Sequence, residues 1–453
     1  MVFTHHFRPS LLRTVASELC GAKGRNFQQI RPSRLASTWM QDAHEMSGTL
    51  GLSGRIHILG VGNIGTFVAH SLASRPSPPP ITLLMHHAGA YSSWLSRKEC
   101  LTIQSNGLDD SKTGFDVNVF HEGTWRSLPF GNKEDDGLPV ERLSISENIA
   151  RRIADLPNSE EDKEPIECLI VSVKAPVTAM ALENVCHRLT PQSTVLFLQN
   201  GMGAIEEINE KVFPDPSRRP HYMFGIISHG LYYKEHFYIT QAGVGTMILG
   251  PELPRNSESL ALNDKEPEWA PSTKYLLRTL TLTPPLVAVA EPSSSLLLHQ
   301  LEKLAMNSII NPLTVLLNCH NGDLLYNYSI TRVMRLLLFE ISSVICSLPE
   351  LQGIPGIESR FSPERLRGMA MQLANKTAKN KSSMLQDVLA GKVTEIEYMN
   401  GYIVRRGEEL GIKCVVNYMI KHLVIAKQQG LKRKESTAIP FDLTDDFHDT
   451  DTT

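Results

Sequence analysis

Short apolar runs alternate with amphipathic segments along the first half of the chain. A strand-like segment begins at Arg55, and its apolar run leads into a glycine-rich turn. A helical pattern over Asn63–Ser74 and a second strand-like run over Ile81–Met85 follow. Strand, tight turn, helix and strand in this order predict a βαβ unit. Because further alternation of this kind follows, we expect a parallel-rich sheet with helices on both faces. The later strand-like runs are Cys168–Val173, Thr194–Leu198 and Tyr222–Ser228, and a helical pattern covers Val177–Leu189.

After about residue 290 the pattern becomes helical throughout. In the last of these helical segments, Thr394 is placed to act as N-cap, Glu397 to complete a capping box and Gly411 to end the helix. The second half is therefore predicted to be an all-helical domain. Its predicted helices are Leu297–Leu317, Ile330–Leu348, Leu366–Thr377 and Thr394–Leu410.

These patterns divide the chain into four parts. A Rossmann-type α/β domain is expected over residues 54–285 and an all-α domain over residues 286–430. Residues 1–53 are interpreted as a targeting leader and linker, and residues 431–453, which are rich in Asp, as a disordered acidic tail. Polar stretches at 106–116, 132–139 and 156–165 are interpreted as surface insertions, and the stretch 251–271 as an exposed loop.

The leader has an unusual composition. The first 35 residues carry six Lys or Arg residues against a single acid, Glu18, with Ser and small apolar residues between them. An arginine-rich, acid-poor N-terminus of this kind is typical of a mitochondrial transit peptide. We therefore expect mitochondrial localisation, with the cytoplasm as the alternative.

Charge and cysteine content exclude several classes of function. The formal net charge of −3 provides no basic field for nucleic acid, and no apolar run approaches the roughly 18 residues that membrane insertion requires. The seven cysteines are scattered, without a CxxC pair, so neither a disulfide framework nor a bound metal is expected. The oligomeric state stays open, a homo-oligomer included.

The glycine-rich turn matches the pattern GxGxxG. Because it follows a predicted strand and opens a predicted helix, it has the context of a dinucleotide-binding fingerprint. The first glycine permits the tight turn, the second lets the backbone approach a pyrophosphate, and the third allows close packing of helix on sheet. The alternative is a tight turn without a ligand. The predicted cofactor-binding residues of the turn are Gly60, Val61, Gly62, Asn63, Ile64 and Gly65.

The end of the second strand bears on the choice of cofactor. Enzymes that use NAD usually have Asp or Glu there to bind the ribose 2′-hydroxyl. This chain instead has His86 and His87, with Arg97 and Lys98 further on. Since a carboxylate would repel a 2′-phosphate while these groups can accept one, the sequence predicts NADP, with His86 as a candidate contact.

Three polar residues form a stripe on the first long helix. Lys303, Asn307 and Asn311 follow each other at intervals of four, which places them on one helix face. A lysine ammonium can supply both a proton and a positive charge to the developing alkoxide of a ketone under reduction. By spacing alone, a solvated polar face explains the stripe equally well.

Several segments, taken in order, resemble the ketopantoate reductase family over roughly residues 54–430. The resemblance implies a Rossmann-type domain, an all-helical domain and an active site in the cleft between them. It also implies NADPH-dependent reduction of 2-dehydropantoate (ketopantoate) to pantoate, a step toward pantothenate and coenzyme A. The matching segments after the glycine turn are Val171–Ala175, Leu198–Gly203, Lys303–Thr314, Asn380–Asp387 and Thr394–Gly401.

The resemblance assigns roles residue by residue. Lys303 matches the proton-donating lysine, and Glu395 the acid that positions the substrate and tunes that lysine. As the first residue after the presumed Thr394 cap, Glu395 is expected to stay ionised in a helix dipole and to keep Lys303 protonated. The resemblance further implies a substrate site at Asn307, Asn311, Asn380 and Ser383, and cofactor contacts at Lys174 and Asn200.

Two other functions remain open from sequence. The chain is also compatible with a paralogue that reduces another small branched 2-oxo acid, because the wall that binds the substrate's methyl groups is not readable from sequence. A non-catalytic NADP-binding scaffold in mitochondria is the third interpretation. Retention of Lys303, Asn307, Ser383 and Glu395 argues against this scaffold.

Overall fold

The computed structural model describes residues 48, 50–128, 130, 145–252 and 269–437. The predicted leader, the polar stretch at 132–139 and the acidic residues after 437 lie outside this range. So does most of the predicted loop at 251–271.

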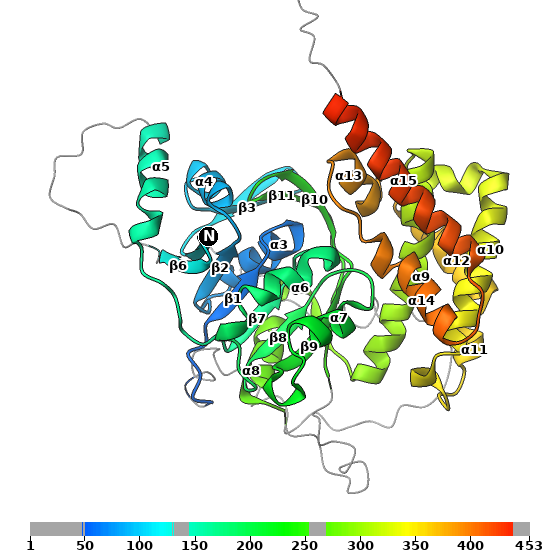
Figure 1. Ribbon diagram of the computed structural model, residues 1–453, viewed down its shortest axis with the longest axis horizontal. Coiled ribbons are helices and arrows are strands. Elements are labelled where there is room, and N and C mark those ends of the chain that lie inside the picture. Colours follow the sequence, from blue (N-terminus) through cyan, green and yellow to red (C-terminus); the bar gives the residue numbers. More distant parts are fainter. Residues whose placement is uncertain (1–47, 49, 129, 131–144, 253–268, 438–453) are drawn as a thin grey trace, which may run out of the picture. The chain divides into compact units, whose positions relative to one another are not determined.

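A nine-stranded sheet forms the first half of the fold (Figure 1). Its order is β13-β12-β9-β8-β7-β1-β2-β5-β6, and the six strands from β9 to β5 run parallel. β6 and β12 are antiparallel to their neighbours β5 and β9. The predicted parallel-rich sheet is therefore confirmed. The strands are β1 (Ile56–Leu59), β2 (Ile81–Met85), β5 (Asp116–His121), β6 (Thr124–Leu128), β7 (Cys168–Val171), β8 (Thr194–Phe197), β9 (His221–Ile227), β12 (Met247–Pro251) and β13 (Ala288–Ala290).

Helices cover both faces of this sheet. Ile58 packs in one buried cluster with side chains of α3 and α8, whereas its neighbour Leu59 packs in another with side chains of α6 and α7. Successive residues of a strand point to opposite faces, so each face of β1 has its own core. The helices of this half are α3 (Asn63–Ala73), α4 (Ala88–Ser96), α5 (Ile145–Ala154), α6 (Ala175–Glu183), α7 (Ala204–Lys211) and α8 (Pro271–Thr281).

A second, four-stranded sheet has the order β10-β11-β3-β4 and was not predicted. The stretch 106–116, which we interpreted as a surface insertion, is largely exposed and forms part of this sheet, because Asn106 and Gly107 make a turn at positive φ and β4 pairs antiparallel with β3. β4 is almost wholly exposed and polar, so it carries no hydrophobic signal. The strands are β3 (Leu101–Ser105), β4 (Leu108–Lys112), β10 (Gly230–Glu235) and β11 (Tyr238–Gly243).

The second half is helical, as predicted, and has its own apolar core. The long helix α9 contacts several other helices of this half, and α15 continues through residues 431–437, which the sequence had assigned to the tail. Within the described ranges no helix has the length and apolar character needed to cross a membrane. The helices are α9 (Ser293–Leu317), α10 (Tyr328–Cys346), α11 (Ile357–Arg360), α12 (Pro363–Lys376), α13 (Ser383–Leu389), α14 (Asn400–Glu409) and α15 (Val415–Thr437).

The predicted capping box at Thr394 is wrong. A 3₁₀ turn occupies Ile396–Tyr398, and α14 begins only at Asn400. The side chain of Asn400 is buried and donates a hydrogen bond to the main-chain oxygen of Ser308, so a tertiary contact sets the start of this helix. The predicted end is confirmed, since Gly411 follows α14 with φ +72°.

Candidate active site

The glycine turn between β1 and α3 is tightly packed on one side and open on the other. A Cβ on Gly65 would lie 2.0 Å from the main-chain oxygen of Gly60, which itself has φ +96°. Gly62 is the N-cap of α3, and a Cβ there would meet nothing within 4 Å. The N-terminal amides of α3 are thus accessible from the turn. This geometry fits a pyrophosphate at the helix N-terminus.

The polar groups after β2 differ in whether they make contacts that support the fold. The Nδ1 atom of His87 accepts the N–H of Ala90 at 3.0 Å and so caps α4. Arg97 pairs with Glu235 at 3.3 Å and lies over the ring of Tyr238. His86 is half-buried, and its burial lowers the pKa of the imidazole. His86 therefore stays the candidate for a cofactor contact.

The polar stripe on α9 faces other parts of the protein. The ammonium of Lys303 donates a hydrogen bond to the main-chain oxygen of Ile227, the last residue of β9, at 3.0 Å. Asn311 is buried, with its amide 3.7 Å from the sulfur of Met399, and Asn307 is half-buried between them. Lys303 and Asn311 thus make contacts within the protein, which argues against a purely solvated polar face.

Lys303 lies in an environment that favours proton release. Burial lowers the pKa of its ammonium to about 8, although the negative charge of Glu395 opposes this shift. A lysine with such a pKa is still mostly protonated at neutral pH, yet it gives up its proton far more readily than an exposed lysine. This is the range that a general acid needs.

Glu302 anchors α9 next to Lys303. Its carboxylate is buried and receives hydrogen bonds from Arg360 (3.0 Å to each oxygen) and Arg365 (2.8 Å). Burial alone raises the pKa of Glu302, but hydrogen bonds from His299 and the two arginines outweigh it and lower the pKa to about 2. The network fixes α9 to the end of α11 and the start of α12.

Glu395 links the helical half to the sheet. Its carboxylate accepts hydrogen bonds from the N–H of Ala175 (3.2 Å) and from the side chain of Asn200 (3.3 Å). These two residues follow β7 and β8, so they mark the carboxyl edge of the parallel sheet, where open α/β folds bind ligands. The structure thus brings together Glu395 and Asn200, as the predicted site requires.

The electrostatic expectation for Glu395 is corrected. Glu395 precedes a 3₁₀ turn, not the first turn of an α-helix, and the helix N-terminus that it meets is that of α6. Burial raises the pKa of this carboxyl, against the opposing effects of Lys174, the Ala175 amide and Asn200. The predicted effect of a helix dipole, which would lower the pKa of Glu395, is therefore not the dominant one. Desolvation is the largest cause of the shift, and it acts in the opposite direction.

One acidic residue in the centre of the site was missed from sequence. Asp387 on α13 forms an ion pair with Lys174, the N-cap of α6. Asp387 is buried, and burial raises its pKa while Lys174 lowers it. The only sequence signal was its place within a segment already singled out by the resemblance.

The two adjacent serines at the start of α13 differ in their surroundings. The hydroxyl of Ser382 is buried, caps α13 by accepting the N–H of Leu385 (3.1 Å) and lies 2.6 Å from the hydroxyl of Thr314. Ser383 is exposed. Of the two, Ser383 is the one that is accessible to a ligand, and its role in substrate binding stays a prediction.

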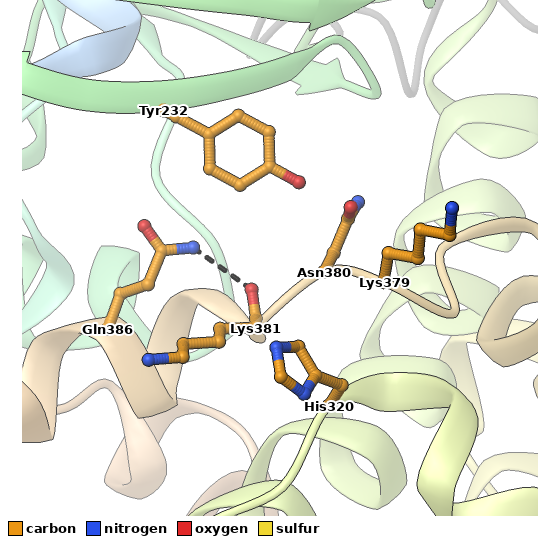
Figure 2. A pocket seen from close by; sticks show the side chains of 6 residues that line it. All are labelled: Tyr232, His320, Lys379, Asn380, Lys381 and Gln386. Carbon is orange, nitrogen blue, oxygen red and sulfur yellow. Dashed lines mark hydrogen bonds between the residues drawn. The ribbon is translucent and has the colours of Figure 1, made fainter.

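Asn380 lines an open pocket of about 480 Å³ between strand β10 and the loop that precedes α13. In Figure 2, the hydroxyl of Tyr232 points from the strand toward Asn380, and the Gln386 amide reaches the main-chain oxygen of Lys381. Asn321, which was not predicted, donates its N–H to the main-chain oxygen of Asn380 at 3.0 Å. Its buried side-chain oxygen has no donor among the described residues. The pocket is lined by Tyr232, His320, Lys379, Asn380, Lys381 and Gln386.

Comparison with known families places this site in context. Residues 56–253 match the family model described as "Ketopantoate reductase PanE/ApbA", and residues 295–428 match "Ketopantoate reductase PanE/ApbA C terminal". Among its relatives, a Schizosaccharomyces pombe protein named "Probable 2-dehydropantoate 2-reductase" is 29% identical, over 84% of this chain and 98% of its own. The 2-dehydropantoate 2-reductase of Saccharomyces cerevisiae is 24% identical over 81% and 93%. The ketoisovalerate reductase BEA2 of Gibberella fujikuroi is 28% identical over 77% of each chain.

Solved structures share the fold at low sequence identity. A D-mandelate dehydrogenase solved with NADH and anilino(oxo)acetate is 18% identical, with a TM-score of 0.60, over 83% of this chain and 99% of its own. A PanE/ApbA family ketopantoate reductase from Ralstonia eutropha has a TM-score of 0.57 at 16% identity over the same shares. Both comparisons support the succession of a sheet-based half and a helical half.

Proposed function

Since this chain belongs to the ketopantoate reductase family, we propose that it is an oxidoreductase that reduces 2-dehydropantoate to pantoate with NADPH. One observation carries the proposal. A lysine with a lowered pKa and a buried glutamate that acts on it both reach the carboxyl edge of the parallel sheet, beside a glycine turn that fits a dinucleotide.

Lys303 is the proton donor in this proposal. When bound, the reduced nicotinamide supplies the hydride. The ammonium of Lys303 uses one of its three N–H bonds for the main-chain oxygen of Ile227 and keeps two for a substrate oxygen. It stabilises the developing alkoxide by its charge and then protonates it. Glu395 holds this ammonium in its charged form.

The remaining site residues orient the substrate. The exposed hydroxyl of Ser383 is suited to a carboxylate, since a hydroxyl donates a hydrogen bond to an anionic oxygen. Asn380 lies at the pocket and offers both donor and acceptor groups. Asn307 and Asn311 extend the Lys303 face along α9. These four residues form the proposed substrate site.

NADP specificity rests on the chemistry after β2. His86 stands where NAD enzymes usually have a carboxylate, and so nothing at that position repels a 2′-phosphate. The glycine turn holds the pyrophosphate in this proposal, and Lys174 and Asn200 contact the dinucleotide further along the sheet edge. The test is the ratio of kcat/KM for NADPH over NADH, and a preference for NADH would contradict the specificity.

The activity itself is tested by nucleotide oxidation with two acids. We expect turnover of 2-dehydropantoate with a kcat/KM well above that for 2-ketoisovalerate, which lacks the hydroxymethyl group. Relatives that carry ketoisovalerate reductase names make this the appropriate comparison substrate. A higher kcat/KM for 2-ketoisovalerate would change the proposed substrate but leave the proposed type of reaction unchanged. Turnover of neither acid would contradict the proposal.

For localisation, we propose import into mitochondria, on the basis of the arginine-rich N-terminal composition. A fluorescent protein fused to residues 1–50 is expected to co-localise with a mitochondrial marker. A second fusion in which the six basic residues are replaced by Gln is the control. A diffuse cytosolic signal from the first fusion would rule this out.

A further inference from the structure

Asp387 is an acidic residue that neither the predicted site nor the proposed reaction uses. It forms an ion pair with Lys174, a residue of the proposed cofactor site. We propose that Asp387 is a positioning residue of that site, which holds the ammonium of Lys174 until a dinucleotide phosphate takes its place. The proposal rests on the proposed function, because Lys174 meets a phosphate only if the glycine turn binds a dinucleotide.

Lys174 comes from a loop that packs on the glycine turn. The loop connects β7 to α6, and the main-chain nitrogen of Val173 lies 2.7 Å from where a Cβ on Gly60 would be. The hydroxyl of Ser172 donates a hydrogen bond to the main-chain oxygen of Gly60. The side chain of Lys174 is 37% exposed. The backbone that precedes Lys174 is therefore packed on the glycine turn, and the side chain of Lys174 is partly accessible to a ligand.

Asp387 holds this ammonium from the helical half of the fold. Its side chain is only 12% exposed, and its main-chain oxygen accepts the N–H of Lys392 at 2.8 Å, which fixes the end of α13. A carboxylate with so little access to water requires a charged partner. Lys174 is that partner, so the ion pair joins α13 to the N-cap of α6.

A second carboxylate reinforces the effect. Glu395 accepts the N–H of Ala175, the residue after Lys174, and also contacts Asn200. Two carboxylates of the helical half thus cover the groups at the N-terminus of α6 that would attract an anion. An incoming dinucleotide carries several negative charges, so Asp387 both repels it and competes with it for Lys174.

The sign of the expected effect follows from this competition. Neutralising Asp387 frees Lys174 and removes a negative charge, so it strengthens dinucleotide binding. A purely structural role predicts the opposite, because loss of the ion pair would then disorder Lys174 and weaken binding. The two explanations therefore differ in the direction of a dissociation constant, which is measured without turnover.

The experiment is calorimetric titration of the full chain with NADPH and with NADH. Asp387→Asn and Asp387→Ser are expected to lower the Kd for NADPH by about three- to tenfold, the scale of one partly exposed ion pair. Lys174→Gln is expected to raise it. The control is Glu397→Gln, which also removes one carboxylate and one lysine contact (Lys421, 3.3 Å) from the same part of the chain. Its Kd is expected to equal that of the wild type.

The outcomes separate the two proposals. If the wild type binds neither nucleotide, the proposed function fails and this inference fails with it. If the wild type binds NADPH but both Asp387 variants leave the Kd unchanged or raise it, only this inference is overturned. Thermal unfolding shows whether each variant is folded. If one Asp387 variant is not, the Kd of the other tests the inference. If the Asp387 variants bind NADPH and NADH more tightly by the same factor, Lys174 contacts the pyrophosphate. If only the affinity for NADPH increases, Lys174 contacts the 2′-phosphate.

Discussion

The ammonium of Lys303 donates its hydrogen bond to Ile227, while Glu395, whose charge raises the pKa of that ammonium, is held by Ala175 and Asn200. The two groups thus act on each other through the protein interior, and each is attached to the sheet by a different element. The acid and the residue that tunes it are therefore positioned independently. This separation makes their electrostatic coupling measurable by mutation.

The first prediction concerns pH. Because Lys303 must be protonated to act as the acid, kcat/KM of the wild type is expected to fall as the pH rises through about 8. Glu395 raises this pKa, so Glu395→Gln is expected to move the fall in activity to lower pH. Glu397→Gln, an exposed change two residues away, serves as the control. An unchanged alkaline limb in Glu395→Gln would show that the two groups are not coupled.

Removal of the proton donor is the second prediction. Lys303→Ala is expected to lower kcat by about 100-fold or more, the usual scale for loss of a general acid. The exposed Lys413→Ala is the matched control and is expected to retain the wild-type kcat. Steady-state nucleotide oxidation with 2-dehydropantoate measures both. Comparable turnover by Lys303→Ala and the wild type would remove Lys303 from the mechanism.

The adjacent serines of α13 provide the third prediction, because one is structural and the other is exposed. Ser382→Ala loses the N-cap and the buried hydrogen bond with Thr314, whose hydroxyl keeps its bond to the main-chain oxygen of Asn311, so the free energy of unfolding is expected to fall by about 1–2 kcal/mol. Ser383→Ala is expected to leave stability unchanged and to raise KM for the acid by about tenfold, the scale of a hydrogen bond to a charged group. Chemical denaturation and steady-state kinetics test the pair, and each variant is the control for the other. Equal effects of both variants on KM would contradict this division.

The elements most accurately predicted were those whose own sequence determines them. The predicted bounds of β2, Ile81–Met85, agree with the structure, because a continuous apolar run lies between a proline-rich breaker and polar histidines. The start of α14 was wrong by six residues, Thr394 against Asn400, since a buried contact of Asn400 with α9 decides where the helix begins. Local capping signals do not contain such a contact.

The candidate site likewise combines a feature that local sequence predicts with a contact that it does not. Lys303, Asn307 and Asn311 were predicted on one face of a helix because helical periodicity alone aligns them. The ion pair between Lys174 and Asp387 was not predicted, because it joins two segments far apart in sequence. Only the packing of α13 against the start of α6 creates it.

A fourth prediction concerns the anchor of α9. The pKa of Glu302 lies at about 2 in the folded protein, below its usual 4.5, so the stabilisation from this carboxylate is complete above about pH 4.5 and is lost as the pH falls toward 2. Glu302→Gln is expected to lower the free energy of unfolding by about 2–3 kcal/mol at neutral pH and by much less at low pH. Glu350→Gln, which breaks an exposed pair with Arg406, is expected to cost less than about 1 kcal/mol. Denaturation at several pH values measures all three proteins. A cost for Glu302→Gln that does not change with pH would disprove the assignment.

The glycine turn gives the last prediction, because two of its glycines are needed for different reasons. Gly65→Ala would place a Cβ 2.0 Å from the main-chain oxygen of Gly60, so it is expected to lower the free energy of unfolding by about 1–3 kcal/mol. Gly62→Ala meets no protein atom within 4 Å and has φ −84°, so the fold is expected to persist. Its added methyl group projects into the open mouth of the turn, where it is expected to raise the Kd for NADPH by about tenfold. Gly368→Ala on α12, where the added Cβ also meets nothing, is the control for both measurements. Should Gly62→Ala bind NADPH as tightly as Gly368→Ala, the pyrophosphate does not approach Gly62, and the proposed placement of the cofactor on this turn is incorrect.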